Sequence, residues 1–379
     1  MKLWIFLKNF IIKYLCDVLM SITDQKYMKQ CIKIAKLGAG NVSPNPLVGA
    51  VIVNNNKIIS KAYHSNYGYL HAEAKAIEQV SFEYLKGSTL YCNLEPCCHT
   101  NKNTPPCVPK IIDSGIKKVI ISNIDPNKFV AGKGIKQLRD SRIEVKLGEC
   151  ETEGYELNKF YFKFIKTGLP FITIKIAHSL DLKISSKKGQ KTNITGYKSN
   201  KFVHYLRSIH DAVLVGANTI KIDNPKLTVR LVKGRNPKKI IIDGNLSSPL
   251  NSFVFNDSNK ELTILFTKSN SDIKKISQLR SNGIKVYELE SDDTGSLKLL
   301  DILKILANEK INSLLIEGGG IIFKMFIKEN LFDEIIFLES PTIFGDGLPL
   351  NINKKSLNIK IIEEKMLGND KKIICSNAD

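Results

Sequence analysis

Short runs of β-branched and aromatic residues alternate along the chain with stretches whose apolar residues recur every three or four positions. The runs favour strands, and the periodic stretches favour helices. Over the first 150 residues the pattern predicts a helix at 26–38, a hairpin at 47–64, helices at 71–80 and 108–115, strands at 87–96 and 117–125, and a helix followed by a strand at 134–148. This alternation predicts a largely parallel sheet covered by helices.

The alternation restarts after residues 158–170, where turn residues precede a new apolar strand. The elements expected beyond this point are strands at 171–181, 211–219, 238–245, 261–267 and 333–345, helices at 199–209 and 297–310, and combined helix and strand segments at 273–289 and 311–331. We therefore expect two α/β domains, over 21–166 and 167–379, preceded by an extension over 1–20.

That extension is apolar but is interrupted by Lys8, Lys13 and Asp17. These charges argue against a membrane span. A signal peptide is not expected either, because no small-residue cleavage site follows the apolar residues. The segment is interpreted either as an amphipathic or disordered extension or as an over-long start ahead of Met20.

The chain is basic, with 56 Lys and Arg against 37 Asp and Glu and a net charge of +19. Because the lysines are scattered, we expect small anionic substrates and neither a nucleic-acid nor a membrane partner. Eight cysteines in 379 residues is a low density that favours a reducing compartment, so a cytoplasmic protein is expected. A homo-oligomer is the expected assembly.

Three cysteines and a histidine crowd into residues 94–107, LEPCCHTNKNTPPC. A catalytic zinc ion takes three Cys or His ligands and keeps one position open. Cys97 and Cys107 stand before or at a predicted helix start, where a thiolate is favoured, and His71 supplies a third ligand. Glu73 follows two residues later and can move protons without binding the metal. The set matches the zinc-deaminase signature H-x-E followed by P-C-x-x-C.

The spacing departs from that signature, because nine residues separate Cys97 from Cys107. Cys98 competes with Cys97 as a ligand. A structural zinc site, with Cys98 or His99 as a fourth ligand, stays an alternative, and a disulfide is the least favoured interpretation. We expect one zinc ion per chain and an unbound Cys98.

Asn45 is held between two prolines ahead of a strand, which makes a rigid mount for an amide that can hydrogen-bond a base or a sugar. His64 is expected to line the same pocket. The alternatives are an ordinary turn for Asn45 and a strand end for His64.

Several motifs occur in one order: Pro-Asn-Pro-x-Val-Gly, His-Ala-Glu, Leu-Glu-Pro-Cys, Thr-Pro-Pro-Cys, and Asp-Pro-Asn with Val-Ala-Gly-Lys-Gly. Together they resemble the bifunctional riboflavin-biosynthesis deaminase/reductase family, in which the loop before Thr-Pro-Pro-Cys is itself long. The resemblance covers about residues 24–345. It implies an N-terminal cytidine-deaminase-like three-layer domain, followed by a dihydrofolate-reductase-like α/β domain that uses NADPH.

The second domain lacks G-x-G-x-x-G but holds IEGGG at 316–320, between a predicted strand and helix, where backbone N–H groups can approach a phosphate. The segments 167–181 and 214–230 resemble the reductase of the same family. By that resemblance the cofactor-binding residues are Ala177, Asn193, Thr219, Asp223, Gly244, Gly319 and Gly320. The substrate-binding residues implied are Lys191, Arg207, Leu227, Arg230 and Glu317. Lys175 and Glu317 together can supply the charge and proton that hydride transfer to a carbonyl or imine requires.

Two segments depart from the family pattern. The loop Gly-Asp/Glu-Ser-x-Trp-Ile-Thr reads GQKTNIT at 189–195, and Ser-Leu-Asp-Gly reads SLDL at 179–182. The loop has therefore lost its aromatic side chain, and we expect weaker NADPH binding with turnover largely spared.

The sequence thus predicts an enzyme of riboflavin synthesis that acts on a small phosphorylated pyrimidine. The first domain would deaminate a diaminopyrimidinone ribosyl phosphate, and the second would reduce the ribosyl group to ribityl. The alternatives are a zinc deaminase with a degenerate second domain, a nucleic-acid deaminase, and a zinc-stabilised binding module. Glu73 argues against the last, because a structural zinc site has no use for a carboxylate beside an open position.

Overall fold

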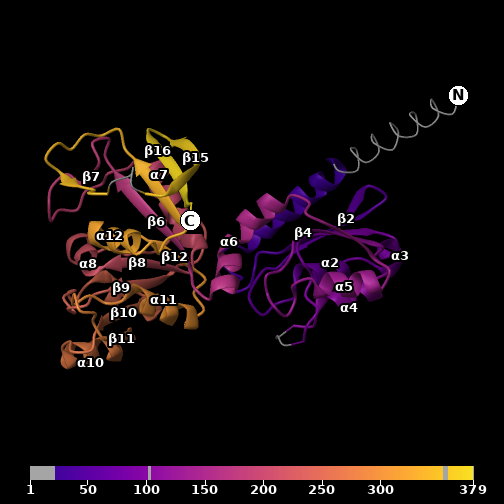
Figure 1. Ribbon diagram of the computed structural model, residues 1–379, viewed down its shortest axis with the longest axis horizontal. Helices are drawn as coiled ribbons and strands as arrows, with labels where there is room; N and C mark the ends of the chain where they lie inside the picture. The colour runs from indigo at the N-terminus through magenta and orange to yellow at the C-terminus, as the bar shows by residue number, and fades with distance from the viewer. Residues whose placement is uncertain (1–21, 101–103, 353–356, 379) are drawn as a thin grey trace. The chain divides into compact units, whose positions relative to one another are not determined.

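The computed structural model describes residues 22–100, 104–352 and 357–378. It divides into two compact units, with the division between Thr167 and Gly168. The extension expected over residues 1–20 lies outside the described residues. Figure 1 shows a sheet with helices in each unit.

The first unit is built on a five-stranded sheet with the order β2-β1-β3-β4-β5. Its strands are β1 (Gly49–Asn54), β2 (Lys57–Tyr63), β3 (Thr89–Leu94), β4 (Lys118–Asn123) and β5 (Glu144–Leu147). The predicted hairpin is confirmed as β1 and β2, which are antiparallel. β1 is also antiparallel to β3, and only β3, β4 and β5 run parallel, so the sheet is less parallel than the alternation suggested.

Helices cover both faces of this sheet. They are a helix over residues 22–35, η1 (Lys36–Gly38), α2 (Ala72–Glu78), α3 (Phe82–Leu85), α4 (Cys107–Asp113), α5 (Lys133–Asp140) and α6 (Glu151–Thr167). Met28 of the first helix packs with Val51 on one face. Ile111 of α4 packs with Ile52 on the other. Because neighbouring residues of a strand point to opposite faces, β1 serves both cores. The three-layer arrangement is therefore confirmed.

The second unit contains a nine-stranded sheet with the order β11-β10-β9-β8-β12-β6-β13-β16-β15. Its strands are β6 (Phe171–His178), β8 (Ala212–Gly216), β9 (Lys238–Ile242), β10 (Thr263–Lys268), β11 (Lys285–Leu289), β12 (Ser313–Ile316), β13 (Glu334–Glu339), β15 (Ile359–Leu367) and β16 (Asp370–Asn377). The strands from β11 to β13 in this order are parallel, as predicted. The antiparallel hairpin β15–β16 at the edge was not predicted.

Two further short strands pair outside the large sheet, namely β7 (Lys183–Ser185) and β14 (Leu348–Pro349). The helices of this unit are α7 (Tyr197–Ile209), α8 (Ala217–Asp223), α9 (Phe253–Asn256), η2 (Lys260–Leu262), α10 (Ile273–Ser281), α11 (Leu299–Asn308) and α12 (Gly320–Lys328). α11 and α12 pack on the face of β8 that carries Leu214. The face that carries Val213 packs against α7 and α10. The strand predicted at 211–219 ends at Gly216, and α8 begins directly after it.

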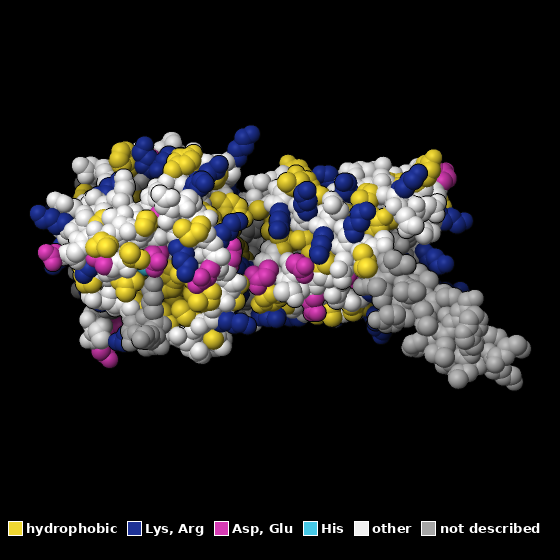
Figure 2. All heavy atoms as spheres, turned by 90° about the horizontal axis from the view of Figure 1, so that it is seen from above, with side chains coloured by type: hydrophobic (Ala, Val, Ile, Leu, Met, Phe, Trp, Pro, Cys, Tyr) yellow, Lys and Arg dark blue, Asp and Glu magenta, His cyan; other side chains and the backbone are white. Residues whose placement is uncertain are grey.

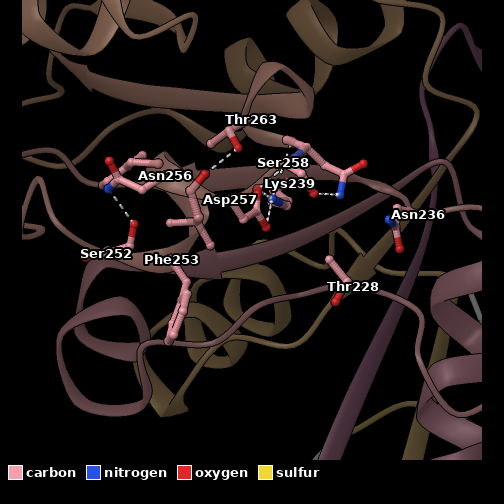
Figure 3. A network of polar contacts seen from close by, with 12 residues as sticks. Thr228, Asn236, Lys239, Ser252, Phe253, Asn256, Asp257, Ser258 and Thr263 are labelled. Carbon is pink, nitrogen blue, oxygen red and sulfur yellow. Dashed lines mark hydrogen bonds and ion pairs between the residues drawn. The ribbon is translucent and has the colours of Figure 1, made fainter.

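A buried ion pair fixes the connection between β9 and β10 (Figure 3). The Lys239 side chain is fully buried, and its Nζ lies 2.6 Å from both carboxylate oxygens of Asp257. Next to it, the hydroxyl of Thr263 donates to the carbonyl oxygen of Val254 at 2.8 Å. A buried lysine needs such a partner, because an unpaired buried charge is very costly. This pair therefore holds α9 against the sheet.

Lys and Arg side chains are spread over both units on the face shown in Figure 2 and do not gather into one patch there. Among the helices formed by the described residues, none has the length and hydropathy that crossing a membrane requires.

Candidate functional site

Three predicted zinc ligands meet in the first unit. His71 immediately precedes α2, Cys97 follows β3, and Cys107 is the first residue of α4. One candidate ligand atom from each residue lies within 4.8 Å of the other two. Nδ1 of His71 is 3.4 Å from each sulfur. Ligands of a tetrahedral zinc with two sulfurs and a nitrogen are about 3.5 Å apart, so this donor set fits the ion.

The start of α4 is hydrogen-bonded to Cys97, and one backbone N–H group approaches its sulfur. The N–H of Cys107 points to Sγ of Cys97 at 3.4 Å, and the N–H groups of Cys107 and Val108 donate to the Cys97 carbonyl at 3.0 and 3.1 Å. Two ligands are therefore joined by the first turn of α4, although nine residues separate them in the sequence. The long spacing between the two cysteines therefore does not prevent them from lying side by side, as the zinc-deaminase signature requires.

The other ring nitrogen of His71 faces Thr104. Oγ1 of Thr104 lies 3.2 Å from Nε2 of His71. A hydrogen bond to the second nitrogen of a ligand histidine fixes its ring orientation and tautomer. The sequence reasoning missed Thr104 as a site residue, although it begins the Thr-Pro-Pro-Cys motif.

Glu73 lies in the first turn of α2, two residues after His71, and is only 3% exposed. The N-terminus of a helix favours acidic side chains, so this position suits a carboxylate. This is the environment that the proposed proton-transfer role needs.

Asn45 and His64 are brought together beside the metal ligands. Nδ2 of Asn45 lies 3.1 Å from Nε2 of His64, whose Nδ1 lies 3.2 Å from the carbonyl oxygen of Leu70. The rings of His64 and His71 are 5.3 Å apart, edge to face. A cavity of about 330 Å³ opens on the side of His71 and Thr104. Neither Asn45 nor His64 lines this cavity, so what the structure shows is that they contact each other and adjoin the ligand histidine.

Cys98 lies outside the metal-ligand cluster. Its Sγ approaches the carbonyl oxygen of Phe129 at 3.7 Å. Burial, followed by the nearby Glu95 carboxylate, raises the pKa of the Cys98 thiol, which opposes a thiolate ligand. No disulfide joins the cysteines of the described part of the chain.

Glu95 of the Leu-Glu-Pro-Cys motif is a buried anchor that the sequence reasoning did not interpret. Its carboxylate accepts hydrogen bonds from four backbone N–H groups, those of Asp125, Gly132, Gly134 and Ile135. A Cβ at Gly134 would lie 2.3 Å from the carbonyl oxygen of Pro96, so only glycine permits this approach. The Leu-Glu-Pro-Cys and Val-Ala-Gly-Lys-Gly motifs are therefore one physical unit.

A larger cavity, of about 720 Å³, lies in the second unit at the carboxyl ends of β8 and β9 and at the N-termini of α8 and α12. This is the usual ligand position in an open parallel sheet. Five of the predicted cofactor residues line it, namely Thr219, Asp223, Gly244, Gly319 and Gly320. Ser185 and Thr192 also line it, with their hydroxyl oxygens 3.0 Å apart. No sequence signal singled out these two residues.

The remaining predicted cofactor residues are not among those that line this cavity. Ala177 belongs to β6, and Asn193 is exposed in the loop that has lost its aromatic residue. Lys191, predicted to bind substrate, reaches the cavity wall instead, because its Nζ lies 3.5 Å from the carbonyl oxygen of Asp223. Burial raises the pKa of Asp223, against the opposing charges of Lys191 and Lys175.

Lys175, Arg207 and Glu317 form a charged cluster. Nε and Nη2 of Arg207 donate to the two carboxylate oxygens of Glu317 at 2.6 and 2.9 Å. Nζ of Lys175 lies 3.6 Å from the same carboxylate. Burial raises the pKa of Glu317, but the charges of Arg207 and Lys175 outweigh it and bring the pKa down to about 2. Glu317 is therefore a fixed negative charge at the end of β12.

Arg230 joins this cluster through Thr228. Nη1 of Arg230 donates to the Thr228 hydroxyl at 2.6 Å, and Nη1 of Arg207 donates to the Thr228 carbonyl at 3.2 Å. The backbone N–H of Arg230 donates to Nδ1 of His204, and burial with both arginine charges lowers the pKa of His204 to about 4. Leu227 is buried in the core. His204 is a neutral residue of this site that the sequence reasoning missed.

Comparisons with known proteins agree with both units. Residues 21–123 match the family described as the cytidine and deoxycytidylate deaminase zinc-binding region, and residues 170–373 match the RibD C-terminal domain. The riboflavin biosynthesis protein RibD of Aquifex aeolicus is 41% identical over 351 residues, or 92% of this chain and 95% of the relative. The Bacillus amyloliquefaciens protein of the same name is 41% identical over 326 residues, or 86% of each chain.

Solved structures show the same two-part architecture. Acinetobacter baumannii RibD superposes with a TM-score of 0.85 at 30% identity, covering 95% of this chain and 100% of that chain. A Thermotoga maritima structure, named as a diaminohydroxyphosphoribosylaminopyrimidine deaminase/5-amino-6-(5-phosphoribosylamino)uracil reductase, gives 0.83 at 35% identity, with 95% and 100% covered. With a zinc-deaminase unit and a reductase unit matched in one order, the chain belongs to the bifunctional riboflavin-biosynthesis deaminase/reductase family.

Proposed function

We propose that the chain catalyses two consecutive steps of riboflavin synthesis. The first is hydrolytic deamination of 2,5-diamino-6-(5-phosphoribosylamino)pyrimidin-4(3H)-one. The second is reduction of the product, 5-amino-6-(5-phosphoribosylamino)uracil, to the ribityl compound with NADPH. The observation that carries this proposal is the presence, in one chain, of the His71, Cys97 and Cys107 cluster and of a second charged cluster around Glu317.

In the first unit, one zinc ion per chain would be held by His71, Cys97 and Cys107. Zinc bound there supplies a Lewis acid that activates water for attack on the ring carbon bearing the amino group. Glu73 takes the proton of that water and passes it to the leaving ammonia. Asn45 and His64 orient the pyrimidine through hydrogen bonds, since both lie beside His71.

In the second unit, NADPH would occupy the large cavity and supply the hydride. Lys175 is the proton donor to the ribosyl group, because its Nζ projects from β6 and is positioned by the Glu317 carboxylate at 3.6 Å. Arg230 and Arg207 bind the substrate phosphate, supported by their shared contacts with Thr228. Arg207 also holds Glu317, so it couples substrate binding to the proton donor.

We place the enzyme in the cytoplasm, where a reducing environment preserves thiolate ligands. The match over residues 170–373 disfavours a degenerate second domain.

Incubating the purified chain with the diaminopyrimidinone phosphate, with and without NADPH, tests the proposal. Ammonia should be released without NADPH, and NADPH should be oxidised only after deamination. Oxidation with the deaminated intermediate but no ammonia release from the first substrate would reject the first step. The opposite pattern would reject the second.

A further inference from the structure

The large cavity of the second unit extends beyond the glycine turn to the ends of β9 and β10. There it is lined by Gly244, Asn245, Lys268 and Ser296. In the sheet order, β10 is three strands away from β12, which carries Glu317 at its end. At about 4.8 Å per strand, the two ends are roughly 14 Å apart. A dinucleotide whose nicotinamide lies near Glu317 therefore places its adenosine half over this end.

Lys268, the last residue of β10, lies across the loop that follows β9. Its Nζ donates to Oδ1 of Asn245 at 3.1 Å. Its Cε is 3.4 Å from where a Cβ on Gly244 would stand, and its Nζ is 4.0 Å from the corresponding point at Gly295. Glycine at both positions leaves the ammonium group room to face the cavity.

No carboxylate forms an ion pair with Lys268 among the described residues. The nearby acidic groups are engaged within their own turns. Asp272 accepts from two backbone N–H groups as the N-cap of α10, and Asp292 accepts from Thr294 and Ser296. Lys268 is therefore a cation that an anionic ligand can pair with.

The acidic residue that follows β9, Asp243, does not compete with Lys268 for the ribose of a bound dinucleotide. It follows β9 directly, in a position where dinucleotide-binding folds often use an acidic residue to bind the ribose 2′-hydroxyl. Here one oxygen accepts from the N–H and the hydroxyl of Ser247, at 2.8 and 3.0 Å, and the other accepts from the N–H of Ser248 at 2.7 Å. Asp243 is 2% exposed and its carboxylate is turned into its own loop, so both of its oxygens are already engaged and are not offered to a ribose 2′-hydroxyl.

We infer that Lys268, positioned by Asn245, binds the 2′-phosphate of the adenosine ribose and selects NADPH over NADH. The inference rests on the proposed reductase function and assigns its cofactor preference to one residue. A phosphate accepts charge-assisted hydrogen bonds from an ammonium, whereas NADH offers only a neutral hydroxyl at the same place.

The test measures the dissociation constants of NADP⁺ and NAD⁺ by calorimetry on the full-length, zinc-loaded chain. Lys268→Gln should weaken NADP⁺ roughly 10- to 100-fold, the value of a hydrogen bond to a charged group, and leave NAD⁺ within about twofold. Lys268→Arg should keep the preference, because it retains the cation. Lys324→Gln is the matched control, since Lys324 lines the same cavity from α12. It should change both dinucleotides by the same factor.

Thermal unfolding of each variant verifies that the chain is folded. If wild type binds NADP⁺ tightly and Lys268→Gln keeps the full preference, the role of Lys268 is rejected while the reductase function stands. Equal weakening of both dinucleotides by Lys268→Gln would also reject it. If wild type binds neither dinucleotide, the reductase proposal and the inference fall together.

Discussion

The hydroxyl oxygen of Thr104 lies 3.2 Å from Nε2 of His71, while Nδ1 of the same ring lies 3.4 Å from the sulfurs of Cys97 and Cys107. A zinc ion bound through Nδ1 leaves the proton on Nε2, which can then donate to Thr104. The hydroxyl can accept that proton, so the contact is compatible with the tautomer of His71 in which the metal-facing nitrogen carries a lone pair, and it holds the orientation of the ring.

Replacing Thr104 by Val should weaken zinc binding about 10- to 100-fold, because Val keeps the shape but cannot accept the hydrogen bond. Thr104→Ser should bind zinc nearly as wild type. Competition with a chromogenic chelator measures the affinities. Equal zinc affinity for the Val and Ser variants would show that the contact has no part in metal binding.

Among the clustered cysteines, only Cys97 and Cys107 should be required for zinc. Substituting either by Ala, or His71 by Ala, removes one of three ligands and should lower the metal content well below one ion per chain. Cys98→Ala is the control, because its sulfur points to the carbonyl of Phe129 and should leave the content unchanged. Atomic emission on the purified variants measures it. Loss of zinc in Cys98→Ala with retention in Cys97→Ala would reverse the ligand assignment.

Glu73→Gln should keep zinc and lose deamination. Gln fills the same buried volume but cannot carry a proton, and general acid–base catalysis is typically worth ~10²–10⁴-fold. Ammonia release at saturating substrate gives the rate, and emission spectroscopy shows that the metal is retained. NADPH oxidation with the deaminated intermediate should be unaffected. A variant within a few-fold of wild type in deamination would remove Glu73 from the mechanism.

Leu182→Gly should stabilise the chain by roughly 0.5–1 kcal/mol. Leu182 stands where the family pattern has glycine and adopts φ of 59°, in the left-handed region that costs a non-glycine residue about 1–2 kcal/mol. Part of that gain is offset by the greater freedom of glycine in the unfolded chain. Because Leu182 is 42% exposed, little packing is lost.

Urea unfolding of the full chain measures this change. Leu180→Gly is the matched control, since Leu180 is also exposed but has no positive φ, and it should be destabilising. Destabilisation of similar size in both variants would mean that the turn holds no strain at Leu182.

Acid should destabilise the second unit through Glu317. Its folded pKa of about 2 is below the ordinary 4.5, so its ion pairs contribute stability above about pH 4.5 that is lost as the pH falls towards 2. The shift corresponds to a contribution of about 3 kcal/mol. Urea unfolding at several pH values should show this loss in wild type and a shallower loss in Glu317→Gln. Identical pH dependence of the two proteins would contradict the assignment.

The sequence predicted the elements whose patterns were strong. The β1–β2 hairpin, the parallel strands of the nine-stranded sheet and the placement of His71 and Cys107 at helix starts follow from local periodicity and turn chemistry. The β15–β16 hairpin was missed because β15 is an edge strand with exposed side chains on both faces, so no apolar alternation marks it. α6 was missed because its polar residues and the non-helical Asn158 obscure the helical period.

Contacts between distant segments could not be predicted at all. Lys238 and Lys239 precede three isoleucines at the start of β9, and nothing local reveals that Lys239 is the buried one of the two or that Asp257 reaches it. The contact between Thr104 and His71 likewise depends on how the loop folds back over α2. Motif matching identified the residue types of the site, whereas their hydrogen-bond partners required three-dimensional coordinates.

The four backbone hydrogen bonds accepted by Glu95 connect metal binding to the folding of a remote segment. Cys97 follows Glu95 by two residues, so a metal ion that restrains the sulfur also restrains this carboxylate. The segment from Asp125 to Ile135 should then open and close as one cooperative unit with the metal-binding loop. By thermodynamic linkage, zinc should slow amide hydrogen exchange at Gly132 and Gly134, neither of which contributes a ligand. The metal-binding loop and the segment up to the start of α5 would thus form one cooperative unit, and zinc would raise the free energy of its local unfolding.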